Sequence, residues 1–290
     1  MEKEIPGKVR EMLERYDASN PESFAAQLRG YWLLFEPKST NFIKTELRDL
    51  QENVGIPVAV LKAIGKEIAK QSKKDVDKYL PLSNILWEKF GREGKIVSIY
   101  PFGAMELVDP ERIFPILEDL SRTCISWEDA DQIAMYAVEP IIKKYPDEWL
   151  PRLQPWAEDE NRWLRRIAIT VTGRLAMKQE KIVPVCLQMA EQMLSDEEEV
   201  VRKAVSFGVR LAARGDTAEV RDFLAKHIPP EDRRSAWVLC DIIRSMGVAL
   251  MPEFLPLLPQ FEQWKNDVDV SAKEKRSIES AVKVLKKAEV

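Results

Sequence analysis

A short segment of acidic, apolar and basic residues occurs twice in this chain, thirty-seven positions apart. Residues 159–166 align with residues 196–203, so that Asp matches Asp, Glu matches Glu and Arg matches Arg. In each copy an acidic group precedes an apolar pair, and Arg and a second basic residue follow. Acidic residues favour the first turn of a helix, and a repeat of this length suits a stacked pair of helices. The repeat therefore predicts a fold made of tandem helix pairs.

The rest of the sequence has the same helical periodicity. Apolar positions recur at intervals of three and four residues, in blocks of about a dozen residues, and no segment alternates long enough to build a sheet. The blocks are interrupted at Asn20-Pro21, Gly55-Ile56-Pro57, Leu80-Pro81, Asp109-Pro110, Tyr145-Pro146, Gly215-Asp216 and Pro229-Pro230. Weaker echoes of the repeat lie at residues 127–138 and 233–246. We expect an all-α fold, a curved α-solenoid of tandem antiparallel helix pairs of the HEAT type, forming a single domain over residues 1–290.

Composition and cysteine content indicate the cellular compartment of the chain. The 290 residues are 45% hydrophobic and 32% charged, which is enough to bury a substantial core. No apolar run approaches the roughly 20 residues that a membrane-spanning helix needs, so a membrane role has no support. Cys124, Cys186 and Cys240 are isolated from one another, and no signal sequence is evident. These features predict a reducing compartment, with the cytoplasm as the default.

The sequence lacks the signatures of metal and nucleotide sites. It contains one histidine, His227, and no Cys-x-x-Cys or His-x-x-x-His spacing, so we expect no metal. His227 precedes Ile228-Pro229-Pro230, which places it at a helix end. Neither Gly-x-Gly-x-x-Gly nor a phosphate-binding loop is present, so we expect no cofactor. If the protein is an enzyme, its chemistry depends on carboxylates, aromatic residues and arginines.

The charges are segregated along the chain. The net charge of −4 is unlike that of most nucleic-acid-binding domains. The acidic residues, however, cluster at 158–160 and 196–199, where helices are predicted to begin. Basic and flanking residues follow at helical spacing, so that each segment can present a basic ridge. The members are Arg166, Thr170 and Arg174 in one segment, and Lys203, Phe207, Arg210 and Arg214 in the next.

Residues 126–131 and 163–166 carry the most informative side chains. Trp127 and Asp131 are four residues apart and share one face of a predicted helix, and Arg166 can extend that face from a neighbouring helix. An aromatic ring, a carboxylate and a guanidinium together suit a site where positive charge develops beside a phosphate backbone. Asp129 follows Ser126 at the spacing of a capping box, so we assign it to helix capping.

These residues resemble the AlkD-like DNA alkylation repair family. The resemblance rests on residues 55–62, 126–131, 163–166 and 203–205 and covers roughly residues 55–214. Members of the family are HEAT-like glycosylases that bind duplex DNA in a positively charged concave groove and release cationic N3- and N7-alkylpurines. The resemblance implies that Trp127 and Asp131 are the catalytic Trp and Asp, and that Arg166 is the active-site Arg. Phe207 replaces a second groove tryptophan of the family.

The resemblance also implies a partner and a set of DNA contacts. The partner is double-stranded DNA with alkylated purines, bound by a monomer that associates with the nucleoid when on DNA. The site needs neither metal nor cofactor. Besides Phe207, the residues expected to contact DNA are Arg165, Arg174, Lys203, Arg210 and Arg214.

The chemistry of an alkylated purine fits these side chains. Alkylation at N3 or N7 makes the base cationic, so it leaves without a strong general acid. Asp131 would stabilise the oxocarbenium-like sugar and orient the attacking water. Trp127 would pack against the sugar and supply cation–π attraction. Arg166 would hold a flanking phosphate and position Asp131.

Each assignment has an ordinary structural alternative. A tryptophan at a helix start, such as Trp127, often belongs to the core, and Asp131 could be a solvated acid or an ion-pair partner of Arg166. Trp163 is predicted to be core, and Phe207 could line a groove or pack internally. The remaining tryptophans are interpreted as packing residues: Trp32, Trp87, Trp149, Trp156, Trp237 and Trp264. A second function therefore stays open, a non-enzymatic HEAT-type module that binds DNA or a protein partner and keeps vestigial active-site residues.

Overall fold

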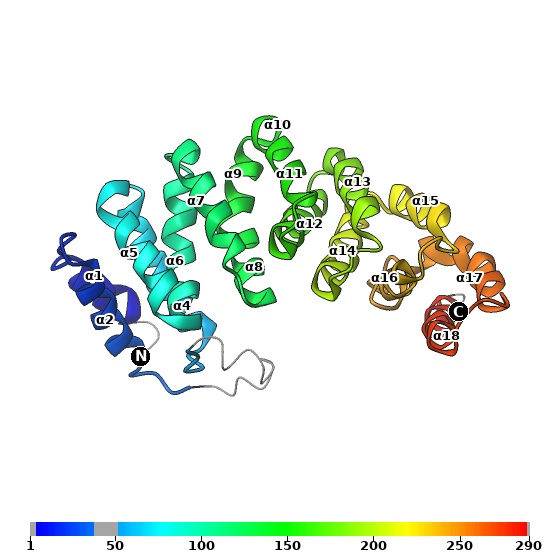
Figure 1. The fold of residues 1–290 in the computed structure, drawn as a ribbon, viewed down its shortest axis with the longest axis horizontal. Coiled ribbons are helices and arrows are strands. Elements are labelled where there is room, and N and C mark those ends of the chain that lie inside the picture. The colour runs from blue at the N-terminus through cyan, green and yellow to red at the C-terminus, as the bar shows by residue number, and fades with distance from the viewer. Residues whose placement is uncertain (1–3, 38–51, 289–290) are drawn as a thin grey trace. The chain divides into compact units, whose positions relative to one another are not determined.

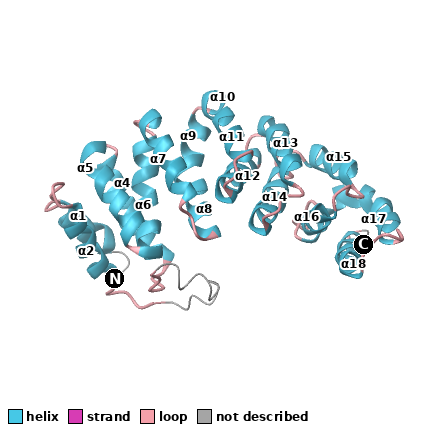
Figure 2. Ribbon diagram, viewed as in Figure 1, coloured by secondary structure: helices cyan, strands magenta, loops and turns pink. Residues whose placement is uncertain are grey.

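A computed structural model describes residues 4–37 and 52–288 of the chain, which divides into two compact units. The units are Met1–Pro146 and Asp147–Val290. Within the described ranges every regular element is helical (Figures 1 and 2). This confirms the predicted all-α fold, whereas one continuous domain over residues 1–290 stays a prediction.

The first unit is organised around one buried helix, α6 (Gly91–Glu106). Its other helices are α1 (Ile5–Leu13), α2 (Pro21–Trp32), α4 (Val58–Ser72), α5 (Val76–Lys89), α7 (Pro110–Arg122), α8 (Trp127–Ile133), the π-helical turn η2 (Ala134–Val138) and α9 (Glu139–Lys144). Helices α4, α5, α7 and α8 and the turn η2 all pack against α6. Almost every residue of α6 is buried, including its charged residues Arg92, Glu93 and Lys95. Buried charges in a central helix need partners, and these decide the position of α8.

Helix α8 runs without interruption into η2 and α9. The η2 turn lies directly against α6, because a Cβ atom at Gly103 would collide with the carbonyl oxygen of Tyr136. Only glycine permits this approach of two backbones. A π-helical turn inside an α-helix often marks a functional site, and here it follows Trp127 and Asp131 directly.

The second unit is a stack of helices in two layers (Figure 1). Its elements are α10 (Pro146–Trp149), which starts at the last residue of the first unit, η3 (Leu150–Leu153), α11 (Gln154–Ala157), α12 (Arg162–Ala176), η4 (Glu180–Ile182), α13 (Val183–Met193), α14 (Glu199–Ala212), α15 (Thr217–His227), α16 (Arg233–Arg244), η5 (Met251–Leu257), α17 (Leu258–Lys265) and α18 (Ala272–Lys287). In one layer α12, α14, α16 and α18 pack each against the next, and in the other α11, α13, α15 and η5 do so. Helices α12 and α14 thus contact their partners α11 and α13 as well as the equivalent helix of the next pair. This packing confirms the predicted tandem helix pairs.

Most predicted breaks coincide with helix ends. The Asn20 side chain accepts the Ser23 N–H at 3.1 Å and caps α2, and α15 ends at His227 as expected. The break predicted at Leu80-Pro81 is wrong, because α5 continues through Pro81. Proline in a helix interior costs about 3 kcal/mol. Burial of the apolar face of α5, which includes Tyr79 and Leu82, offsets that cost.

Helices α12 and α14 approach each other through two glycines. A Cβ atom at Gly173 would lie 2.5 Å from the Cα of Gly208, and one at Gly208 would lie 2.9 Å from the carbonyl oxygen of Ile169. Both distances are below van der Waals contact, so neither position accommodates a methyl group without a backbone shift. The two glycines therefore fix the spacing between the helices that carry Arg166 and Phe207.

We expect Gly173→Ala to destabilise the protein by about 1–3 kcal/mol through overpacking. Gly30→Ala is the matched control, because nothing lies within 4 Å of a Cβ atom at Gly30 in α2. A helical Gly→Ala change without a clash stabilises by up to about 1 kcal/mol. Thermal unfolding of both variants measures the difference, and a Gly173→Ala protein as stable as the parent would contradict the close approach.

Glu106, another buried charged residue of α6, has no hydrogen-bond partner for its carboxyl group among the described residues. Its carboxyl is 0% exposed. Burial raises the pKa of Glu106 well above 4.5. The native protein therefore holds this carboxyl neutral under conditions where the unfolded chain ionises it.

Glu106 should make stability fall as the pH rises. Because its native pKa is raised, its contribution is fully present below the unfolded pKa of 4.5 and is lost as the pH climbs toward the native pKa. Glu106→Gln removes the ionisable group, so the variant should gain melting temperature relative to the parent between pH 4.5 and 8. Glu88→Gln, at an exposed position of α5, serves as the control. A difference between Glu106→Gln and the parent that is constant with pH would refute this.

Candidate active site

The first turn of α8 is capped by its own side chains. The Ser126 hydroxyl accepts the Asp129 N–H at 3.1 Å, and the Asp129 carboxylate accepts the Ile125 N–H at 3.1 Å. These bonds satisfy donors that a helix start otherwise leaves unpaired. The capping role predicted for Asp129 is confirmed, and the cap fixes where Trp127 enters the helix.

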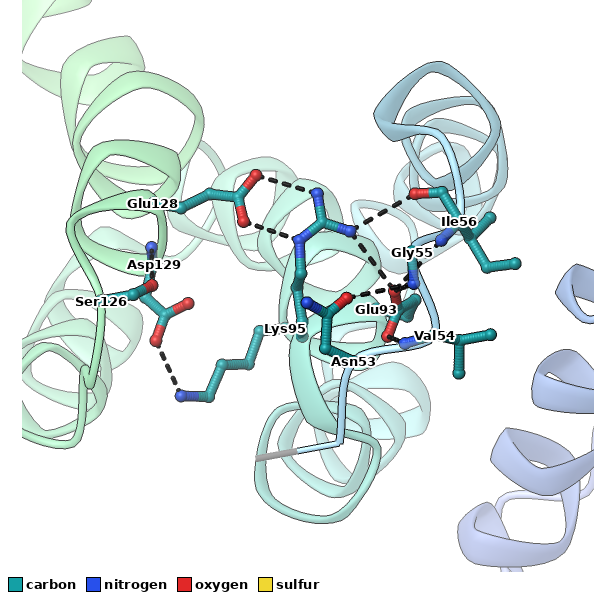
Figure 3. Close-up of polar contacts among 10 residues, drawn as sticks. Asn53, Val54, Gly55, Ile56, Glu93, Lys95, Ser126, Glu128 and Asp129 are labelled. Atoms are coloured by element: carbon teal, nitrogen blue, oxygen red, sulfur yellow. Dashed lines mark hydrogen bonds and ion pairs between the residues drawn. The ribbon is translucent and has the colours of Figure 1, made fainter. Parts of the chain in front are cut away.

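Two buried ion pairs attach the same turn to α6 (Figure 3). The Arg92 guanidinium donates to both oxygens of Glu128, with distances of 2.7 Å from Nε and 3.0 Å from Nη2. The Lys95 ammonium lies 2.9 Å from Asp129. Since Arg92 is 2% and Asp129 3% exposed, water competes little for these contacts. Residues 128 and 129, in the first turn of α8, are thus both held by one neighbouring helix.

Arg92 and Glu93 extend this network to the segment before α4 (Figure 3). The Glu93 carboxylate accepts the N–H groups of Val54, Gly55 and Ile56 at 3.2, 2.9 and 3.3 Å. Arg92 Nη1 donates to the Ile56 carbonyl at 3.3 Å. The segment can present three successive N–H groups because Gly55 has φ of +85°.

The network of Arg92, Glu93, Lys95 and Glu128 was missed in the sequence. Its only local signal is three charges, Arg92, Glu93 and Lys95, next to the apolar run that starts at Ile96. Their partners lie elsewhere in the chain, and no local pattern names them. We call these four residues and Asp129 the α8 clamp.

Trp127 and Asp131 lie one turn apart on α8, beside the clamp. The Trp127 ring is 44% exposed, which excludes the alternative that it is a core residue. Asp131 is half-buried. Of the three carboxylates in the helix, the side chains of Glu128 and Asp129 are engaged by α6.

The remaining predicted site residues belong to the second unit. Arg166 in α12 is 9% exposed, and its Nη1 donates to the Val200 carbonyl at 2.6 Å. It therefore joins α12 to the first turn of α14. Arg174, two turns further along α12, is half-buried.

Helix α14 presents Phe207 between basic residues. Phe207 is 38% exposed, and the Arg210 guanidinium lies 5.9 Å from its ring centre. Arg210 also donates to the Ser206 and Ser245 carbonyls at 3.2 Å each, and burial lowers its pKa. One turn before Phe207, Lys203 pairs with Glu199 at 2.5 Å. Arg214, just beyond the helix, is exposed and contacts the Met177 sulfur.

Arg165 binds residues of both copies of the sequence repeat. Its guanidinium donates to both oxygens of Asp196, at 2.6 and 2.9 Å, and to the carbonyls of Asp159 and Glu160. The hydrogen bonds to Asp196 raise the pKa of Arg165. The pair joins the two copies of the sequence repeat. A DNA contact by Arg165 stays a prediction, and it would compete with this pair.

The tryptophans separate into buried and accessible sets. Trp163 is buried, as predicted, and so are Trp32, Trp87, Trp149, Trp156 and Trp264. Trp237 departs from the expected packing role, because it is half-buried and lines a pocket. No local pattern predicts this position, since Trp237 has no partner motif nearby.

In the described part of the chain, no three His, Cys, Asp or Glu side chains are grouped so that they could hold a metal ion. The helices of that part also include none that is long and apolar enough to cross a membrane.

Comparison with known proteins identifies the family of this chain. A family model described as DNA alkylation repair enzyme matches residues 34–239, more than half of the chain. The chain belongs to the DNA alkylation repair enzyme family. No curated protein matches it. Among solved structures, a chain from the complex in which Kap95p binds RanGDP is similar, with 16% identity and a TM-score of 0.38, over 93% of this chain and 37% of that chain.

The α8 clamp should be essential for stability in this family member. Arg92→Met leaves Glu93 and Glu128 without their cation, which we expect to destabilise the protein by about 3–5 kcal/mol, as removal of one partner of a buried pair does. Lys8→Met, which breaks the exposed pair with Glu11, should change the melting temperature far less. Equal effects of the two substitutions would mean that the clamp does not hold α8.

Proposed function

We propose that this DNA alkylation repair protein is a glycosylase that hydrolyses the N-glycosidic bond of N3- or N7-alkylated purines in duplex DNA. The observation that carries the proposal is the exposed Trp127 ring with Asp131 one turn later on a rigidly held helix. The α8 clamp holds the first turn of α8, which carries Trp127, against α6.

The proposed reaction needs little from the protein besides electrostatics. The bond between the sugar C1′ and the purine nitrogen breaks, and its electron pair neutralises the cationic base. Asp131 stabilises the positive charge that develops on the sugar. Water then forms the new bond to C1′, and its proton passes to Asp131 or to solvent. A half-buried carboxylate suits this task because partial exclusion of water strengthens its attraction for the sugar.

Trp127 and the second unit supply binding. An exposed indole at the start of α8 offers a flat face for the sugar and for the cationic base. Arg166, Lys203 and Arg210 would neutralise phosphates, and Phe207 would provide an apolar surface next to Arg210. Arg166 already donates to the α14 backbone, so its guanidinium is held in a fixed orientation. Fixed cations lose little entropy when a phosphate binds.

Asp131→Asn tests the mechanism. The variant keeps the shape of the side chain but not its charge, so it should fold and bind DNA while releasing base roughly 100-fold more slowly or worse. The measurement is single-turnover release of N7-methylguanine from a duplex with one such lesion. Asp119→Asn, at an exposed position of α7, is the matched control and should keep the parent rate.

Two outcomes would contradict the proposal in different ways. If Asp131→Asn releases base as fast as the parent, the carboxylate is not the chemical group. If neither protein releases base but both bind the lesion duplex tightly, the chain is a recognition module with vestigial site residues.

A further inference from the structure

A pocket with a volume of about 680 Å³ lies in the second unit, where α14, α16 and α18 begin. These three helices are successive members of one layer, so the pocket crosses two helix interfaces. Its lining includes Ser271, Lys273, Glu274 and Ser277, which follow residue 239, the last residue of the family match. The pocket uses none of Trp127, Asp131 and Arg166. It is therefore separate from the candidate active site.

The rim of the pocket is strongly basic. Its charged side chains are five cations and two carboxylates: Arg202, Lys203, Arg233, Arg234, Lys273, Glu199 and Glu274. Both carboxylates have partners, because Glu199 pairs with Lys203 at 2.5 Å and Glu274 accepts the N–H and hydroxyl of Ser271 in a capping box. A net positive site in a chain with a net charge of −4 indicates an anionic ligand.

The cations at the rim differ in how many hydrogen bonds and ion pairs they already make within the protein. Arg234 pairs with Asp232 at 2.8 Å, and Arg202 donates to the carbonyls of Asp196 and Glu197. Arg233 donates to the Asp269 carbonyl only through Nη2, which leaves other N–H groups of its guanidinium for a ligand. Lys273 is exposed, and no carboxylate in the described part of the chain pairs with it. Lys273 and Arg233 are therefore the cations best placed to bind an anion.

The wall of the pocket offers an aromatic face. Trp237 in α16 is half-buried there, and the neighbouring residue Ala236 adds an apolar surface. The Ser277 hydroxyl, buried beside the Cys240 thiol, adds a polar group. An inorganic phosphate would need the cations but not the indole. A ligand that uses both carries a flat ring and a phosphate.

We propose that this pocket binds one nucleotide of a nucleic-acid strand, with the base against Trp237 and its phosphate on Lys273 and Arg233. Pockets of about 300–1,000 Å³ hold ligands of nucleotide size. Stacking on an aromatic ring together with a basic rim is how proteins bind unpaired nucleotides. Lys203 lines the pocket and lies one turn before Phe207, so a strand that follows α14 reaches the pocket directly. The site extends the proposed DNA contacts and does not depend on base release.

Two fluorescent probes and one competitor test the proposal with the full-length chain. The probes are a short oligothymidylate and the same backbone with abasic sites, and the competitor is free thymidine monophosphate. Lys273→Glu should weaken oligothymidylate binding about tenfold, since it reverses a phosphate contact. Lys275→Glu is the matched control, because Lys275 is exposed on the same helix and does not line the pocket. Equal losses for both lysine variants would overturn the proposal.

A second variant tests the base contact. The parent should bind oligothymidylate about tenfold more tightly than the abasic strand, as expected for loss of stacking. Trp237→Leu should remove that difference without changing the affinity for the abasic strand. A preserved difference would overturn the role of Trp237. If thymidine monophosphate competes as well as the strand does, per nucleotide, the ligand is a free nucleotide. That result would overturn the proposal that the pocket binds a nucleic-acid strand. Unchanged release of N7-methylguanine by these variants keeps this test separate from the glycosylase proposal.

Discussion

The guanidinium of Arg92 is the contact on which the candidate active site depends. It lies 2% exposed in α6 and binds Glu128 in α8 and the Ile56 carbonyl before α4. A buried guanidinium is tolerated only when its donors are satisfied, so the three segments have to meet at one place. Trp127 precedes Glu128 by one residue and inherits its position from this contact. Lys95 and Asp129 add a second attachment in the same turn.

A similar solution recurs in the second unit. Arg165 reaches from one helix pair to Asp196 at the start of the next, as Arg92 reaches from α6 to Glu128 in α8. Each pair joins an arginine to a carboxylate by two hydrogen bonds; Glu128 lies in the first turn of α8, and Asp196 lies just before α14. Trp127 and Arg166 lie near the starts of α8 and α12. Inter-helix ion pairs therefore secure the stability of the stack and the position of its reactive side chains together.

The sequence predicted what depends on local pattern. Periodicity and proline breaks gave the helix pairs, and the repeat gave their spacing. Sequence reasoning failed where a contact between residues far apart in the chain determines the structure. Pro81 lies inside a helix because the buried face of α5 outweighs the missing N–H, and the pair between Arg165 and Asp196, 31 residues away, was not predicted. The partner of Arg92 lies 36 residues away, so no local pattern could reveal it. Trp237 lines a pocket only because α18 completes the wall.

The proposed chemistry rests on a leaving group that is already charged, since Asp131 is proposed to stabilise the sugar and not to protonate the base. The most direct measurement compares base release from two duplexes that differ only at one position, N7-methylguanine in one and hypoxanthine in the other. The account predicts release of the cationic base and none of the neutral base above the uncatalysed rate. Release of hypoxanthine at a comparable rate would contradict it, because a neutral purine needs a proton donor that the proposed site does not include.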